Sequence, residues 1–323
     1  MADASKTALE LKGTLVSGGA YVLVGATGSG KTLVAHTIAR ACGAHVLSAD
    51  SMAVYRGMRI GTAAPDSMLQ SEVRYHGLEL VDPVEVFSIH DYMQHARKVV
   101  EAARNDDAPL IVAGGSGLYI KCLMNGLDET PGADAALREF WSDQVARLGL
   151  SALQDEARSR QPAEFELLSD SDRRNARRLI RLLERGGKPE SWQDAGRNAA
   201  QMVGLRLPSE PLKQRLHARA AGMMECGLLE ETRLLMAKGP NRTASQAIGY
   251  SEAIDVLNGQ LTEGQAVDRI ARRSWGLARK QMTWFRHQAK VLWIDVEPSG
   301  SIDTVIEAVF RTWLDSGPAE LRV

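Results

Sequence analysis

The 323-residue sequence has few cysteines, few aromatic residues and almost no net charge. Its three cysteines, Cys42, Cys122 and Cys226, are far apart, so we expect a reducing compartment, the cytoplasm, and neither a disulfide framework nor a zinc site. With 39 basic and 40 acidic residues the net charge is −1, which excludes a uniformly basic nucleic-acid coat and an acidic disordered tail. No stretch approaches the ~20 apolar residues of a membrane span, and Asp3 and Glu10 argue against a signal peptide.

The hydrophobic fraction of 44% is ample for a sizeable core, and the length suggests about two domains. Short apolar runs without polar alternation are typical of buried parallel strands, and they cover residues 21–24, 45–47, 78–81 and 110–113. Helical patterns follow at residues 32–41 and 90–105. Strands that alternate with helices predict the α/β class, as a doubly wound parallel sheet.

The pattern changes near residue 121. Residues 133–200 have almost no strand signal, and helices are expected at residues 135–148 and 172–185. Residues 209–290 are again helical, followed by a strand at 291–295 and a helix at 302–315. We therefore predict a core of residues 1–120 and 201–323, interrupted by a helical insertion at residues 121–200.

Residues 25–32 match the phosphate-binding loop pattern G-x-x-x-x-G-K-[ST] between a predicted strand and a predicted helix. The loop consists of Gly25, Ala26, Thr27, Gly28, Ser29, Gly30, Lys31 and Thr32. Its glycines let backbone N–H groups face an anion at the positive end of a helix. Lys31 supplies a positive charge, and the Thr32 hydroxyl is a candidate Mg²⁺ ligand. The motif predicts binding of a diphosphate or triphosphate, without deciding between them.

No acidic residue ends the later strand at residues 110–113, which runs into Gly114, Gly115, Ser116 and Gly117. A hydrolysing NTPase usually has an aspartate there to hold Mg²⁺, so a motor or GTPase is disfavoured. The glycines themselves suit close approach of a substrate or a plain strand-to-helix turn.

Asp50 follows the second predicted strand, at the sheet edge where open α/β proteins bind their ligands. A carboxylate there can accept a proton from an attacking O–H or N–H group. The alternative is an aspartate that only stabilises a turn or caps a helix.

Two stretches are locally basic. Residues 172–188 contain seven basic residues and two acidic ones, with Arg174, Arg177, Arg178, Arg181 and Arg185 spaced to form one cationic helix face. Residues 270–290 contain six basic residues, no acidic residue, and three aromatic residues, Trp275, Trp284 and Phe285. Such patches either bind a polyanion such as a nucleic acid or are ordinary solvated faces.

Together these motifs resemble the tRNA dimethylallyltransferase family, also called tRNA isopentenyltransferases, in the same order over residues 21–293. The most specific matches are the segment Asp-Ser-Met-x-Val-Tyr-Arg-Gly at residues 50–57 and Thr-Trp-Phe-Arg at residues 283–286. Other matching pieces are residues 25–32, 60–63, 81–83, 114–119, 175–184, 227–229, 247–252 and 281–282.

The resemblance implies an enzyme that transfers a dimethylallyl group from its diphosphate to N6 of adenosine 37, beside the tRNA anticodon, with Mg²⁺. It implies that the loop with Lys31 and Thr32 holds the diphosphate, that Asp50 accepts the N6 proton, and that the insertion grips the anticodon stem-loop. By motif position the tRNA-contacting residues are Asp50, Ser51, Met52, Ala53, Ser116, Arg138, Arg177, Arg178, Leu179, Ile180 and Arg181. We expect a monomer.

Three positions depart from the family pattern: Ala53 replaces glutamine, Ala64 replaces lysine and Trp275 replaces an arginine expected near the diphosphate. Either Arg272, Arg273 or Arg279 supplies the missing charge, or activity is reduced.

Three alternatives remain open. A small-molecule kinase with a phosphate-binding loop also uses an aspartate after its second strand. A non-enzymatic RNA-binding descendant would explain the three departures. A prenyltransferase acting on free adenine nucleotides would retain the chemistry, although the basic insertion disfavours it.

Overall fold

The computed structural model describes residues 11–127, 135–186 and 202–323. The chain divides into two compact units: a core unit, Met1–Leu127 with Gly196–Val323, and an insertion unit, Asp128–Ala195. Helix α4, Gly117–Asn125, lies in the core unit, so the predicted start of the insertion at residue 121 is too early. Within the described ranges, no helix is long and apolar enough to cross a membrane.

The core unit is built on a sheet of six strands that are all parallel, in the order β3-β2-β4-β1-β5-β6. The strands are β1 Ala20–Gly25, β2 His45–Ala49, β3 Tyr75–His76, β4 Leu110–Gly114, β5 Met202–Arg206 and β6 Val291–Asp295. The predicted α/β class and parallel sheet are thus confirmed.

Two strand assignments differ from the prediction. The strand predicted at residues 78–81 is wrong, because the sheet pairs β2 with Tyr75 and His76, whereas Val81 bridges Tyr55 outside the sheet. Strand β5 was not predicted, since it is short and has Gly204 at its centre. A Cβ on Gly204 would overlap the side chains of Val291 and Trp293 on β6, so glycine permits this close strand packing.

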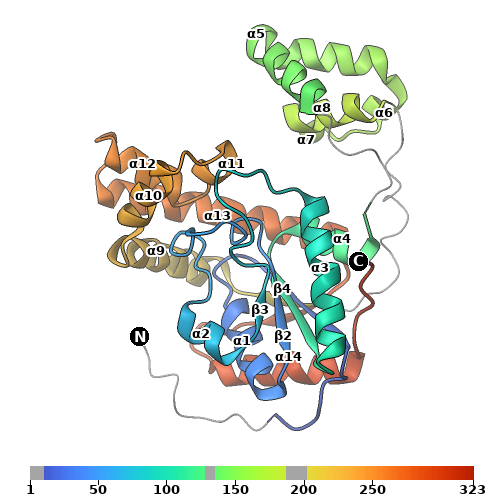
Figure 1. The fold of residues 1–323 in the computed structure, drawn as a ribbon, viewed down its shortest axis with the longest axis vertical. Helices are drawn as coiled ribbons and strands as arrows, with labels where there is room; N and C mark the ends of the chain where they lie inside the picture. The colour runs from blue at the N-terminus through green and yellow to red at the C-terminus, as the bar shows by residue number, and fades with distance from the viewer. Residues whose placement is uncertain (1–10, 128–134, 187–201) are drawn as a thin grey trace. The chain divides into compact units, whose positions relative to one another are not determined.

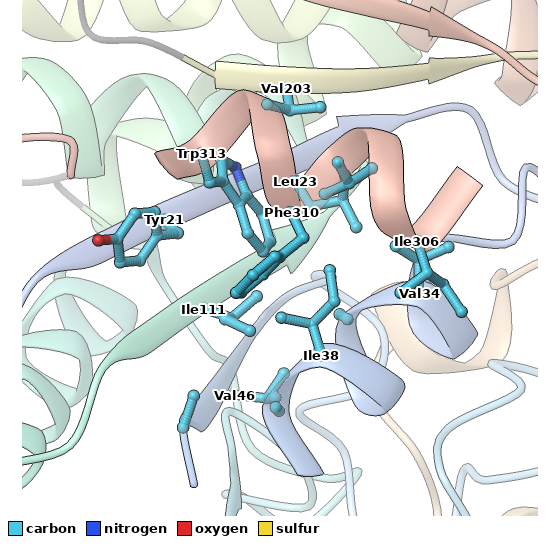
Figure 2. Packing of buried hydrophobic residues seen from close by; sticks show 14 of the residues in the cluster. Tyr21, Leu23, Val34, Ile38, Val46, Ile111, Val203, Ile306, Phe310 and Trp313 are labelled. Carbon is cyan, nitrogen blue, oxygen red and sulfur yellow. The ribbon is translucent and has the colours of Figure 1, made fainter. Parts of the chain in front are cut away.

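One face of the sheet is covered by α1, Lys31–Cys42, and α14, Ile302–Ser316. Figure 2 shows Phe310 and Trp313 of α14 among Ile38, Val46 and other apolar side chains from α1 and the strands. These side chains are almost fully buried. Burial of each contributes ~1.5–3 kcal/mol, and together they fix α1, whose first residues belong to the phosphate-binding motif.

Helix α3, Ile89–Asn105, begins with a capping box formed by Ser88 and Asp91 and contacts both β2 and α4. Its Tyr92 stacks on Tyr119 of α4, with ring centroids 3.8 Å apart, and its hydroxyl donates to the Ser48 carbonyl at 3.0 Å. The remaining core helices include α9 and α13, which pack against each other along their length. Their bounds are α2 Ser67–Glu72, α9 Ser209–Glu225, α10 Leu228–Ala237, α11 Arg242–Ser245, α12 Tyr250–Leu257 and α13 Glu263–Gln288 (Figure 1).

The insertion unit is helical, as predicted, and contains α5 Ala135–Arg160, α6 Pro162–Glu166, α7 Asp170–Arg173 and α8 Ala176–Arg185. Gly149, with φ of 83°, interrupts α5 just after the predicted helix 135–148. The predicted helix 172–185 is broken, because the side chain of Asn175 accepts from the Arg177 N–H and starts a new helix there. Arg174 therefore lies outside α8, and the predicted single cationic face is shorter than expected.

Candidate active site

The phosphate-binding loop connects β1 to α1 at the carboxyl edge of the sheet. Gly28 and Gly30 have φ of 81° and 93°, a region that favours glycine. A Cβ on Gly28 would also lie 2.8 Å from the Leu216 side chain of α9, which would have to shift. The loop geometry that the motif requires is therefore built into the sequence.

Some backbone N–H groups of this loop donate to protein acceptors and others do not. The Ser29 N–H donates to the Ala26 carbonyl at 3.2 Å, and the Thr27 N–H donates to Oε1 of Gln281 at 2.8 Å. Among the described residues, no protein group accepts from the N–H groups of Gly28, Gly30, Lys31 and Thr32. These four donors at the start of a helix form an anion site.

Lys31 lies at the base of the loop, where Nζ donates to the Ala26 carbonyl at 2.7 Å. The pKa of Lys31 is lowered to about 8, mainly by desolvation; Asp50 opposes the shift and the nearby Arg219 adds to it. The ammonium group is thus poorly solvated without an anion, and a bound phosphate group would favour its charged form.

Asp50 follows β2 directly, and its Oδ1 accepts from the Met52 N–H at 2.8 Å. Asp50 is therefore a turn residue. No described residue hydrogen-bonds to Oδ2, and the side chain is exposed toward a cavity of about 410 Å³. The turn role and a role as proton acceptor are compatible, because each uses a different oxygen.

The cavity joins the phosphate-binding loop to the end of β2. Of the predicted site residues, Thr27, Gly28, Gly30, Lys31, Thr32, Asp50 and Ala53 line it. The cavity also has an apolar wall, formed by Ala53, Ala63, Ala64, Pro65 and Leu78. Gly25, Ala26 and Ser29 of the loop are buried and do not line the cavity.

Two cavity residues, Arg215 and Arg219 of α9, were missed by the sequence analysis. Arg219 donates to Oγ1 of Thr27 at 3.3 Å and to the Thr62 carbonyl at 3.2 Å. Desolvation lowers the Arg219 pKa, and Asp50 opposes this shift. The only available signal was the spacing of four residues, which puts both arginines on one helix face.

Neither Trp275 nor any of the three arginines proposed to replace its charge lines this cavity. Arg273 pairs with the buried carboxylate of Glu252, and Arg272 and Arg279 are exposed elsewhere on α13. The expectation of a substitute among these residues stays a prediction. The positive charge beside the loop comes from α9, Arg215 and Arg219.

The glycines after β4 leave space for side chains of α13. A Cβ on Gly115 would overlap the amide of Gln281, and a Cβ on Gly117 would overlap the Trp284 ring. Of the possible tRNA contacts in the core unit, Ser51, Met52 and Ser116 are half-buried, whereas Ala53 is only 4% exposed. A methyl group so buried offers little contact to RNA outside the cavity.

In the insertion unit, Leu179 and Ile180 are 0% and 6% exposed and pack with Trp141, Leu153 and Phe165. Their predicted tRNA contact is wrong for the side chains, because the apolar face of α8 points into the unit's own core. Among the arginines of this unit, Arg138 and Arg181 both pair with the buried carboxylate of Glu184, at 2.9 and 3.3 Å.

The other two predicted contacts on α8 differ from each other. Arg178 pairs with Asp172 at 3.0 Å. Arg177 is exposed, and within the described part of the chain it forms no ion pair. Arg177 is therefore the α8 arginine most available to an anionic partner.

Lys31 generates a pH prediction. Above a pH of about 8 its ammonium group loses its proton, so affinity for an anion in the cavity should fall as pH rises from 7 to 9.5. Titration of inorganic diphosphate by calorimetry measures this, with Lys31→Arg as the control because arginine stays charged. The arginine variant should have a flatter profile, and parallel profiles for the two proteins would contradict the assignment.

Comparisons with known proteins cover most of the chain. The sequence model of a family described as IPP transferase matches residues 53–288. The tRNA dimethylallyltransferase of Syntrophobacter fumaroxidans is 34% identical over 304 residues, covering 91% of this chain and 86% of that protein. The enzyme of the same name from Geobacter sulfurreducens is 34% identical over 298 residues, covering 90% and 96%.

Solved structures agree with these relatives. The full-length tRNA isopentenylpyrophosphate transferase of Bacillus halodurans has a TM-score of 0.67 at 30% identity, covering 92% of this chain and 96% of that one. A eukaryotic dimethylallyltransferase captured acting on tRNA shares the fold, with a TM-score of 0.72 at 20% identity over 94% of this chain and 81% of its own. The chain belongs to the tRNA dimethylallyltransferase family.

Proposed function

We propose that this member of the family transfers a dimethylallyl group from dimethylallyl diphosphate to N6 of adenosine 37 in tRNA and releases diphosphate. The observation that carries the proposal is the single cavity in which an anion-binding loop, an apolar wall and the free oxygen of Asp50 meet. The loop can bind a diphosphate, the apolar wall can contact an allyl group, and the carboxylate can accept a proton from an amine.

The reaction forms one N–C bond and breaks one C–O bond. The N6 nitrogen attacks the allylic carbon while the bond from that carbon to the diphosphate oxygen breaks, and Asp50 accepts the N6 proton. Charge develops on the departing diphosphate, where Lys31, Arg219 and the loop N–H groups stabilise it. Because no phosphoryl group is transferred, the missing acidic residue after β4 is not needed.

Mg²⁺ suits the donor set of this cavity. Its oxygen donors include the Thr32 hydroxyl and the Asp50 carboxylate, and no cluster of three metal-binding side chains occurs within the described residues. Mg²⁺ is commonly held by one or two protein oxygens, substrate phosphates and water, so Thr32 would be its ligand in the proposed site. The ion would offset the negative charge of the diphosphate.

The substrate base must leave the anticodon loop stack to reach N6 in such a cavity. The proposed role of the insertion unit is to grip the anticodon stem-loop, supported by Arg177, Arg178, Arg181 and Arg138 on its surface. We propose that the protein acts as a monomer in the cytoplasm.

The direct test incubates the protein with Mg²⁺, dimethylallyl diphosphate and an unmodified tRNA that carries adenosines at positions 36 and 37. Mass spectrometry of the digested nucleosides should detect N6-dimethylallyladenosine. A protein that binds the tRNA without product would instead be the RNA-binding descendant, and turnover of AMP without tRNA turnover would indicate action on free nucleotides.

Asp50→Asn should lower kcat by about 10²–10⁴-fold, because it removes the proton acceptor. An asparagine Oδ1 still accepts from the Met52 N–H, so the turn is retained and tRNA affinity should change less than about twofold. Single-turnover kinetics and filter binding measure the two effects. Asp66→Asn is the matched control, since Asp66 also accepts from a backbone N–H but does not line the cavity. Near-normal turnover of Asp50→Asn would remove the proton-acceptor role.

Arg177→Ala should weaken tRNA binding and reduce the slope of log affinity against log salt by about one contact, ~0.7–0.9. Arg147→Ala is the control, because Arg147 is an exposed arginine on α5 of the same unit. Fluorescence anisotropy at several salt concentrations gives both slopes. Equal slopes for Arg177→Ala and the unmodified protein would take Arg177 out of the RNA interface.

A further inference from the structure

The segment at residues 281–286 contains one of the most specific motifs in the sequence, residues 283–286, yet the reaction steps above give the segment no role. In the structure its first residue reaches the phosphate-binding loop. Oε1 of Gln281 accepts from the Thr27 N–H at 2.8 Å, across 254 residues of sequence. Thr27 is held from its other side by Arg219, which donates to Oγ1 at 3.3 Å. Two helices, α13 and α9, thus hold one loop residue.

The same face of α13 contacts the end of β4. The Gln281 amide lies where a Cβ on Gly115 would be, and the Trp284 ring lies where a Cβ on Gly117 would be. Residues three apart share a helix face, so Gln281 and Trp284 act from one side of α13. Between these two glycines lies Ser116, whose N–H donates to the Ala49 carbonyl beside Asp50.

The chemistry of position 281 suits an anion site. Its carboxamide oxygen accepts from the Thr27 N–H. The Thr27 N–H is therefore not one of the four loop N–H groups that have no protein acceptor among the described residues and can bind an anion. A glutamate would also accept from Thr27, but it would add a negative charge to a cavity built for diphosphate. A leucine of similar size would leave the Thr27 N–H without a partner.

We propose that Gln281 is a positioning residue for the donor diphosphate: it fixes Thr27 and, together with Trp284, ties the phosphate-binding loop to the end of β4. This inference rests on the proposed use of the loop as the donor site. Gln281 lines the same cavity, and the inferred effect is the one it exerts through its hydrogen bond to Thr27. The fixed loop keeps the diphosphate in register with Asp50.

The test compares Gln281→Leu and Gln281→Glu with Gln288→Leu, the same leucine change at an exposed position near the end of α13. Calorimetry with inorganic diphosphate and Mg²⁺ measures loop binding without tRNA. Gln281→Leu should weaken diphosphate binding about 5- to 15-fold, in line with the loss of one hydrogen bond.

The KM for dimethylallyl diphosphate should rise by the same factor in this variant, with kcat and tRNA affinity within about twofold of those of the unmodified protein. Gln281→Glu should weaken diphosphate binding more, although its melting temperature stays near that of the unmodified protein. Gln288→Leu should change nothing.

Three results would overturn the inference: diphosphate binding by Gln281→Leu equal to that of the unmodified protein, an equal loss of kcat and of affinity for every substrate, or full retention of binding by Gln281→Glu. The inference can fail independently of the proposed function. An unmodified protein that binds diphosphate but makes no prenylated product contradicts the reaction alone, whereas product formation with unaltered Gln281 variants contradicts the positioning role alone.

Discussion

The cavity depends on the balance between two poorly solvated cations and one carboxylate. Desolvation lowers the pKa of Lys31 and of Arg219, and Asp50 opposes both shifts. Lys31 Nζ donates to the Ala26 carbonyl at 2.7 Å. A diphosphate would supply further negative charge beside both cations. A bound anion would therefore interact electrostatically with both cations and with Asp50.

The apolar wall of the cavity is held by a second long-range contact. The carboxylate of Glu231, on α10, accepts from the backbone N–H groups of Arg59 and Ile60 at 3.0 Å and from that of Gly61 at 3.4 Å. It also accepts from the Tyr250 hydroxyl at 2.6 Å, and this contact adds to the burial that raises the Tyr250 pKa. The segment that follows carries Ala63, whose φ of 50° is unusual for a non-glycine residue. The apolar wall is thus shaped by backbone contacts to α10, and its small side chains leave room for an allyl group.

Local patterns predicted the parts of the site that are encoded locally. The loop motif at residues 25–32, the strand before Asp50 and the helical insertion each follow from a short run of sequence. Arg219 and Gln281 could not be found this way, because they reach Thr27 across 192 and 254 residues. The ion pairs that engage Arg138, Arg178 and Arg181 were equally invisible in a count of basic residues. The burial of Leu179 and Ile180, by contrast, could have been predicted, because together with Leu182 and Leu183 they form one apolar helix face. The tRNA contact was assigned to them from the motif match instead.

The departure at Trp275 bears on whether the chain is an enzyme or an inactive relative. Trp275 packs beside Ala26, Leu212 and Leu216 at the back of the phosphate-binding loop, and the Lys213 ammonium lies 5.2 Å from its ring centroid. Leu212 and Leu216 are also the residues that crowd Gly28, so Trp275 supports the apolar side of the loop. The cavity retains positive charge although residue 275 is a tryptophan, because Lys31, Arg215 and Arg219 line it. The departure therefore alters packing behind the loop and leaves the charges that would hold a diphosphate in place, which favours an active transferase over a binding protein that has lost its chemistry.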